Sequence, residues 1–278
     1  MKVVIFCGGL GMRLREYAEN VPKPMVPIGY RPVLWHLMKY YAHFGHKDFI
    51  LCLGYRADAV KEYFLNYNEC MSNDFTLSHG GKRLDLHNSD IEDWNITFAD
   101  TGLTSNIGQR LKAVQKYVAG EEVFLANYAD GLTNMYLPDL IDFAKKQDKI
   151  ATFVSVRPSL SYHLVSAGSD GMVKDISEIS RSQIRVNGGF FTFKQSIFDY
   201  MRDGEELVLE PFQRLIREGQ LVTYPFDGYF ATMDTFKDKQ TLDDLYVSGK
   251  APWQIWNGPA KSDSVPSMRL VDPVAKTL

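Results

Sequence analysis

Short apolar runs alternate with amphipathic segments over the first two thirds of the chain, and this alternation limits the fold. The apolar runs predict buried strands at residues 2–7, 48–54, 122–131 and 149–156. The amphipathic segments predict helices at residues 32–44, 57–67, 107–118 and 137–147. Strands that alternate with helices form a mostly parallel sheet with helices on both faces. We therefore expect an α/β fold, with a Rossmann-like sheet flanked by helices.

Two segments interrupt this order. Residues 75–100 and 160–195 contain short β-like pieces and no strong helical pattern. The first of them predicts a small β-rich insertion at about 68–100. Further elements follow, with helices near 195–202, 209–218 and 235–248 and a strand at QLVTYPF. We expect one domain over residues 1–256 and a poorly ordered extension over residues 257–278, which has three prolines and little periodicity.

Composition excludes several classes of protein. The 278 residues carry a formal net charge of -3 and no long basic run, which argues against nucleic-acid binding. No stretch approaches the roughly 20 apolar residues that a membrane helix needs, so no membrane association is expected. The chain has only three cysteines, which makes a disulfide framework improbable and favours a reducing, cytoplasmic location.

A glycine cluster follows the first predicted strand, in the stretch FCGGLGMRLR. Glycines let backbone N–H groups approach a phosphate closely. This cluster lacks the lysine of a P-loop and the third glycine of a dinucleotide fingerprint. Lys23 lies between two prolines, ten residues after Arg13. An arginine fork and a lysine point charge from one loop could both face a polyphosphate.

Two aspartates follow strand ends much later in the chain. Asp130 lies in an Ala-Asp-Gly turn, and Asp234 lies in Met-Asp-Thr at a predicted helix start. Each has a simpler interpretation, as a turn residue or as part of a helix cap. Two carboxylates, together with phosphate oxygens and water, are also the ligands that Mg²⁺ commonly uses.

The order of these motifs carries a resemblance. GGLGMRL and PKPM, followed by ADG, NGGFF and MDT, resemble the sugar-phosphate nucleotidyltransferases, whose opening signature is GGxGTRL followed by PKPM. Within this family the chain is most similar to the glucose-1-phosphate cytidylyltransferases, through stretches such as PVLWHLMKYY, DWNITFADTG and GKAPWQIW. The resemblance implies the nucleotide-diphospho-sugar transferase fold and homo-oligomer formation. It also implies Mg²⁺-dependent transfer of CMP from CTP to a phosphorylated acceptor.

The resemblance also implies roles for individual residues. Arg13 and Lys23 are the catalytic candidates, for the leaving pyrophosphate and the α-phosphate. Asp130 and Asp234 are the candidates for holding Mg²⁺. The candidate nucleotide-binding residues are Gly8, Gly9, Leu10, Gly11, Met12, Arg110 and Asp130. The candidate acceptor-binding residues are Asn187, Gly188, Glu178, Arg181 and Glu210.

Several departures from the family pattern fall on the acceptor side. Ile179 stands where the family's Glu-Lys-Pro has its lysine, and Tyr162-His163 stands where relatives have a small glycine. Met12 replaces the threonine of the opening signature. The metal and triphosphate candidates are kept. The resemblance implies a sugar 1-phosphate such as glucose 1-phosphate as the acceptor. The departures lead us to hypothesise that nucleotidyl transfer persists while the acceptor is another sugar phosphate, or a smaller phosphate or phosphonate.

Two other functions are each compatible with part of the sequence pattern. A catalytically silent paralogue could bind a nucleotide or nucleotide sugar and regulate a partner, and the altered acceptor side favours this alternative. A nicotinamide-dependent oxidoreductase would need an acidic residue about 20 residues after the glycines, at the end of a second strand. The chain has the proline-rich loop PKPMVPIG there, which argues against this class.

Overall fold

An eight-stranded, mostly parallel sheet forms the centre of the computed structural model, which describes residues 1–9, 21–158, 162–179 and 182–258. β1 pairs in parallel with β4 and β8, and β4 pairs in parallel with β7. β14 is antiparallel to β8 and β10, so β8 and β10 run in the same direction. β13 is antiparallel to β10, and β15 is parallel to it. The strands of this sheet are β1 (Val3–Phe6), β4 (Asp48–Leu53), β7 (Asn95–Asp100), β8 (Val123–Tyr128), β10 (Ala151–Val156), β13 (Val186–Asn187), β14 (Phe191–Lys194) and β15 (Leu221–Phe226).

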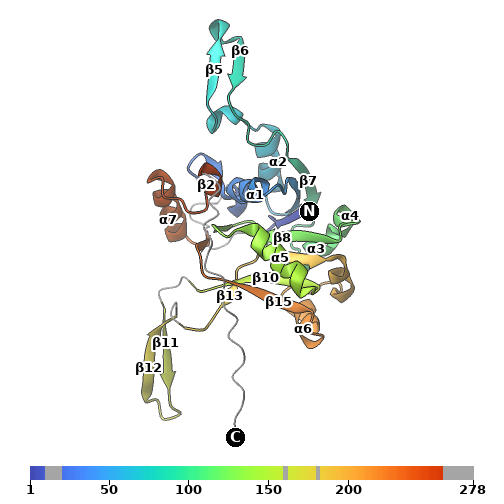
Figure 1. The fold of residues 1–278 in the computed structure, drawn as a ribbon, viewed down its shortest axis with the longest axis vertical. Helices are drawn as coiled ribbons and strands as arrows, with labels where there is room; N and C mark the ends of the chain where they lie inside the picture. The colour runs from blue at the N-terminus through green and yellow to red at the C-terminus, as the bar shows by residue number, and fades with distance from the viewer. Residues whose placement is uncertain (10–20, 159–161, 180–181, 259–278) are drawn as a thin grey trace.

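Helices cover both faces of the sheet (Figure 1). They are α1 (Val33–His43), α2 (Ala57–Leu65), α3 (Ile107–Ala113), α4 (Gln115–Val118), α5 (Leu137–Gln147), α6 (Glu210–Arg217) and α7 (Phe236–Val247). The predicted helix near residues 195–202 is a 3-10 helix, Gln195–Tyr200. The predicted α/β fold with a mostly parallel sheet is confirmed.

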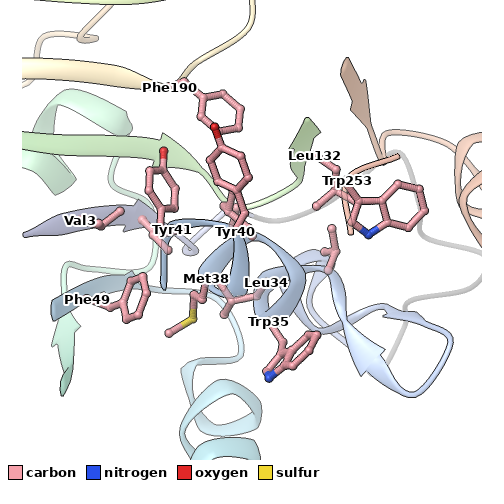
Figure 2. Packing of buried hydrophobic residues seen from close by; sticks show 14 of the residues in the cluster. Val3, Leu34, Trp35, Met38, Tyr40, Tyr41, Phe49, Leu132, Phe190 and Trp253 are labelled. Carbon is pink, nitrogen blue, oxygen red and sulfur yellow. The ribbon is translucent and has the colours of Figure 1, made fainter. Parts of the chain in front are cut away.

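The central strand explains why the sheet has two cores. Every residue of β1 is buried, and successive side chains point to opposite faces. Val3 and Ile5 belong to one cluster together with α1, while Val4 and Phe6 belong to the other together with α3 and α6. Figure 2 shows the first cluster, in which Tyr40 and Tyr41 of α1 approach Phe190. Burial on both faces is what a continuous apolar strand of a parallel sheet requires.

Two hairpins project from opposite ends of the body (Figure 1). One pairs β5 (Phe75–Ser78) with β6 (Arg83–Leu86), and the other pairs β11 (His163–Ala167) with β12 (Val173–Glu178). The first hairpin is the core of the predicted insertion. Residues 95–100, which the sequence placed in that insertion, instead form β7 in parallel register with β4. Their short alternating pattern resembles that of the hairpin before them, which hid their membership of the main sheet.

Two short ladders complete the fold, β2 (Pro27–Ile28) with β3 (Arg31–Pro32) and β9 (Gly131–Thr133) with β16 (Phe230–Thr232). No helix in the described part of the chain is long and apolar enough to cross a bilayer.

Candidate active site

The carboxyl ends of the parallel strands meet at one edge of the sheet. β1 leads into the glycines and β8 leads into the turn that holds Asp130. β10 and β15 are followed directly by Arg157 and Asp227 on the same edge. Ligands of open α/β sheets bind beyond such strand ends. The side chains that gather there are therefore the candidates for the active site.

Lys23, Asp130 and Asp234 come together at this edge from distant parts of the sequence. Lys23 lies in the 3-10 turn Lys23–Met25, with Pro22 before it and Pro24 within it. Its Nζ donates to Oδ2 of Asp130 and, over 2.8 Å, to Oδ1 of Asp234. The lysine and Asp130 are mostly buried, with 19% and 17% of their side chains exposed. One ammonium group thus bridges two carboxylates.

The β9–β16 ladder sets the two aspartates side by side. Gly131 pairs with Thr232, so Asp130 and Asp234 lie just beyond the same end of this ladder. The N–H of Met233 donates to the carbonyl of Asp130 over 3.3 Å. Thr232 Oγ1 donates to Oδ2 of Asp234 over 3.0 Å and fixes the orientation of that carboxylate.

The electrostatics of this group suit a hard cation. Burial alone would lower the pKa of Lys23, but the carboxylates of Asp130 and Asp234 outweigh it and raise the pKa. The two aspartates therefore already hold a positive charge at one point. Among the described residues no group of three or more His, Cys, Asp and Glu side chains could form a metal site by itself. Two carboxylates fit Mg²⁺, which usually takes its other ligands from water and substrate phosphates.

Gly8 and Arg110 are packed against each other at the end of β1. Arg110 is 2% exposed, and its Nη2 donates to the carbonyl of Gly8 over 2.9 Å. Its Nη1 donates to Leu53, Thr101 and Gly102 at the ends of the neighbouring strands β4 and β7. A Cβ on Gly8 would lie 2.1 Å from Nη1 of Arg110. The absence of a side chain at position 8 is therefore what lets this guanidinium tie three strand ends together.

A left-handed turn within the NGGFF segment lies beside the end of β8. Gly189 and Phe190 have φ of +75° and +49°, a conformation that only glycine adopts without cost. The buried Asn127 accepts hydrogen bonds from the N–H groups of Tyr128 and Phe190 through its Oδ1, at 2.9 and 3.0 Å. Asn187 donates to the hydroxyl of Tyr128 over 3.3 Å. Asn187 is therefore held beside Tyr128, which stands two residues before Asp130 in the sequence.

Comparison with known proteins identifies the family. Residues 2–253 match the nucleotidyl transferase family. The chain belongs to this family. Two glucose-1-phosphate cytidylyltransferases, from Salmonella typhimurium and Salmonella typhi, are each 40% identical to it over 258 residues. Each match covers 92% of this chain and 100% of the relative.

Solved structures agree with this nucleotidyl transferase in fold. HddC from Yersinia pseudotuberculosis aligns with a TM-score of 0.60 at 21% identity, covering 88% of this chain and 99% of that chain. A UDP-glucose pyrophosphorylase complexed with UDP-glucose aligns with a TM-score of 0.64 at 14% identity, covering 89% and 98%. At these identities the likeness supports the fold alone.

The structure brings some of the predicted residues of this nucleotidyl transferase together. Lys23, Asp130 and Asp234 meet directly, and Gly8 contacts Arg110. Gly9 is exposed at the same strand end. The guanidinium of Arg110 is engaged by the ends of β1, β4 and β7. Its role in nucleotide binding stays a prediction. Leu10, Gly11, Met12, Arg13 and Arg181 lie outside the described residues.

The acceptor candidates are more scattered. Asn187 and Gly188 lie beside β8 and β10, and the N–H of Gly188 donates to the carbonyl of Val154. Glu178 ends β12 on the projecting hairpin. Glu210 begins α6, where its carboxylate accepts from the N–H of Glu206 over 3.2 Å. Their roles in acceptor binding stay predictions.

Sequence reasoning missed two residues on β8. Tyr128 and Asn127 directly precede the Ala-Asp-Gly turn, and they connect that turn to Asn187 and Phe190. Burial raises the pKa of Tyr128 to about 12, so its hydroxyl stays protonated even at alkaline pH and can donate a hydrogen bond. The one available signal was their position, because side chains that precede a strand end by one or two residues still border the site.

Proposed function

We propose that this protein transfers CMP from CTP to a phosphorylated acceptor, glucose 1-phosphate or a related phosphate or phosphonate, and releases pyrophosphate. The observation that carries the proposal is the meeting of Lys23, Asp130 and Asp234 at the carboxyl ends of the strands. The choice of CTP and of a sugar 1-phosphate comes from the relatives, which carry the name glucose-1-phosphate cytidylyltransferase.

The proposed reaction is an in-line displacement at phosphorus. An oxygen of the acceptor phosphate attacks the α-phosphorus of CTP and forms the new P–O bond. The bond between the α-phosphorus and the bridging oxygen breaks, and pyrophosphate leaves with the electron pair. The acceptor phosphate is already ionised near pH 7, since its second pKa is about 6, so no general base is needed. Positioning and charge neutralisation supply most of the rate acceleration in such transfers.

Asp130 and Asp234 would hold Mg²⁺ in this proposal. The ion would neutralise phosphate charge as the pentavalent centre forms. Lys23 lies between the two carboxylates, and in the complex its ammonium would be available to the α-phosphate. Thr232 would keep the carboxylate of Asp234 oriented throughout the reaction.

Release of pyrophosphate from CTP tests the proposal. We expect release only when CTP, Mg²⁺ and a phosphorylated acceptor are all present, and slower release with UTP or dTTP. A panel should include glucose 1-phosphate, other sugar 1-phosphates and small phosphonates. If CTP binds but no acceptor gives pyrophosphate, the proposal fails and a regulatory nucleotide-binding protein becomes the better account.

We also propose that the protein forms a homo-oligomer. On the β5–β6 hairpin, Phe75 pairs with Leu86 and Leu77 pairs with Leu84, so one face is wholly apolar and exposed. A two-stranded hairpin is marginally stable alone in water, and a second copy would cover this face. Leu77→Glu should then lower the mass measured by light scattering.

We also propose a cytoplasmic location for the protein. Cys7, Cys52 and Cys70 form no disulfide, which favours a reducing compartment.

A further inference from the structure

Two arginines share one carboxylate at the ends of β10 and β15. Arg157 follows β10, and its Nε donates to Oδ1 of Asp227 over 3.0 Å. Arg185 precedes β13, and its Nη2 donates to the same oxygen over 2.6 Å. The cluster carries two positive charges against one negative charge, so a net positive charge is left at this edge of the sheet.

The cluster lies on the edge where the reaction is proposed to occur. Nη1 of Arg185 donates to the carbonyls of Ser155 and Phe226, at 3.0 and 3.3 Å. Ser155 is the direct partner of Asn187 in the β10–β13 ladder. Asn187 in turn contacts Tyr128, two residues before Asp130. Arg185 stands two residues before the acceptor candidate Asn187, and its guanidinium contacts Ser155, the residue that pairs with Asn187.

The two guanidinium groups retain binding capacity. An arginine has five N–H donors in a fixed fork, and three hydrogen bonds to described residues engage Arg185. Its side chain is 23% exposed and that of Arg157 is 43% exposed, so solvent reaches both. Arg185 and Arg157 outweigh the effect of burial and lower the pKa of Asp227, so Asp227 stays charged and anchors both side chains.

The charge balance of the site shows what this cluster could bind. Lys23 with Asp130 and Asp234 has a net negative charge, which repels a phosphate until a cation is added. An acceptor phosphate that carries about two negative charges needs a separate positive group. Planar, two-pronged recognition of phosphate is what arginine does best.

We infer that Arg185, with Arg157 beside it, forms the subsite that binds the anionic group of the phosphorylated acceptor. This inference rests on the proposed function and deepens it, because it assigns acceptor specificity to the residues just before β13 and just after β10. The subsite selects for a phosphate or phosphonate group and makes few demands on the rest of the acceptor. Asp227 holds both arginines in place before the acceptor arrives.

Arg185→Gln tests the inference through separate kinetic constants. We expect the KM for glucose 1-phosphate to rise about 10- to 100-fold, as expected for loss of charged hydrogen bonds. The KM for CTP should stay within about twofold, because Lys23 and the aspartates are unchanged. Arg185→Lys should recover part of the loss, since it restores the charge without the fork. The matched control is Arg83→Gln, which breaks an exposed Arg–Asp pair on the distant β5–β6 hairpin and should change neither constant.

An unchanged KM for glucose 1-phosphate in Arg185→Gln, with wild-type turnover intact, would overturn the inference and leave the proposed function standing. If the wild type gives no pyrophosphate with any acceptor, the proposed function fails instead. In that case calorimetric titration of glucose 1-phosphate into wild type and Arg185→Gln decides the inference alone, and equal affinities would overturn it. Thermal unfolding of each variant identifies any that are misfolded.

Discussion

The two sides of the proposed site are built from different kinds of structure. Lys23 and Asp130 are mostly buried, beside strands that are covered on both faces by the two cores. Arg157 and Asp227 are 43% and 48% exposed, although Arg185 is only 23% exposed, and the neighbouring acceptor candidates lie on a two-residue strand and a projecting hairpin. The chemistry is thus tied to the stability of the sheet. The acceptor side can change by surface substitution at little cost to the fold.

The largest effect is expected at the metal candidates. Asp234→Asn keeps the shape of the side chain but removes its charge, and Asp130→Asn does the same. Each should reduce CTP-dependent pyrophosphate release by at least about 1,000-fold with every acceptor, since charge neutralisation dominates such transfers. Stopped assays of pyrophosphate over a range of Mg²⁺ concentrations would measure the loss.

Asp93→Asn is the matched control for both variants. Asp93 is 61% exposed and pairs with Lys47 on the outside of the molecule, so its loss should leave turnover unchanged. If Asp234→Asn kept wild-type turnover, Asp234 would not be a metal ligand. The proposed contrast between a buried metal side and an exposed acceptor side would then fail as well.

The next effect is expected where the two sides join. Asn127→Ala removes the oxygen that accepts from the N–H groups of Tyr128 and Phe190. Two buried donors then lose their partner, and the free energy of unfolding should fall by about 3 kcal/mol. The KM for the acceptor should also rise more than the KM for CTP, because the Phe190 turn positions Asn187. Denaturant unfolding and steady-state kinetics measure the two effects.

Thr192→Val, on the neighbouring strand β14, is the comparison for Asn127→Ala. The hydroxyl of Thr192 is buried and has no hydrogen-bond partner among the described residues. Valine has the same shape, so stability should stay equal or increase. A loss of stability in Thr192→Val as large as that in Asn127→Ala would contradict the special role of Asn127.

A smaller effect is expected from the two glycines at the end of β1. Gly8→Ala places a methyl group against the Arg110 guanidinium, which must move. Overpacking of this kind costs about 2 kcal/mol, and it should loosen the strand ends that Arg110 ties together. A Cβ on Gly9 meets no atom of the described residues within 4 Å, so Gly9→Ala should be close to neutral. Thermal unfolding compares the pair, and equal melting temperatures would refute the close-packing argument.

The smallest effect is expected from pH. The carboxylates of Asp130 and Asp234 outweigh burial and raise the pKa of Lys23 above its ordinary value of 10.5. A raised pKa in the folded state means that Lys23 contributes its full stabilisation below that ordinary value and loses it as the pH rises through the raised pKa. Lys23→Met should therefore lower the free energy of unfolding by about 1 kcal/mol near neutral pH. This difference should shrink at alkaline pH above 10.5, where the ammonium group loses its proton, and a difference that persists unchanged through that range would show that the pair is not held as described.

Much of the fold could be predicted because its strands are buried on both faces. Short apolar runs such as VVIF and FILCL are typical of core strands of a parallel sheet. The membership of residues 95–100 in the main sheet is harder to predict, because β7 lies at the edge of the sheet and only one of its residues is buried. A half-exposed edge strand looks like the hairpin before it in the sequence.

The site could be predicted in part, for a similar reason. Lys23, Asp130 and Asp234 each follow or precede a recognisable turn, so the motifs located them individually. That Arg157 and Asp227 join Arg185 in one cluster could not be predicted, because the cluster forms through strand pairing between β10, β13 and β15. The many backbone contacts of Arg110 were equally invisible in sequence.

Tracing the oxygen atoms of the acceptor tests the central claim most directly. The wild-type protein should be incubated with CTP, Mg²⁺ and glucose 1-phosphate whose phosphate carries heavy oxygen, and the products analysed by phosphorus NMR and mass spectrometry. The account predicts a CDP-linked sugar that retains all of the label, with one labelled oxygen bridging to the former α-phosphorus, and unlabelled pyrophosphate. Label in the pyrophosphate, or no CDP-linked product from any phosphorylated acceptor, would contradict it.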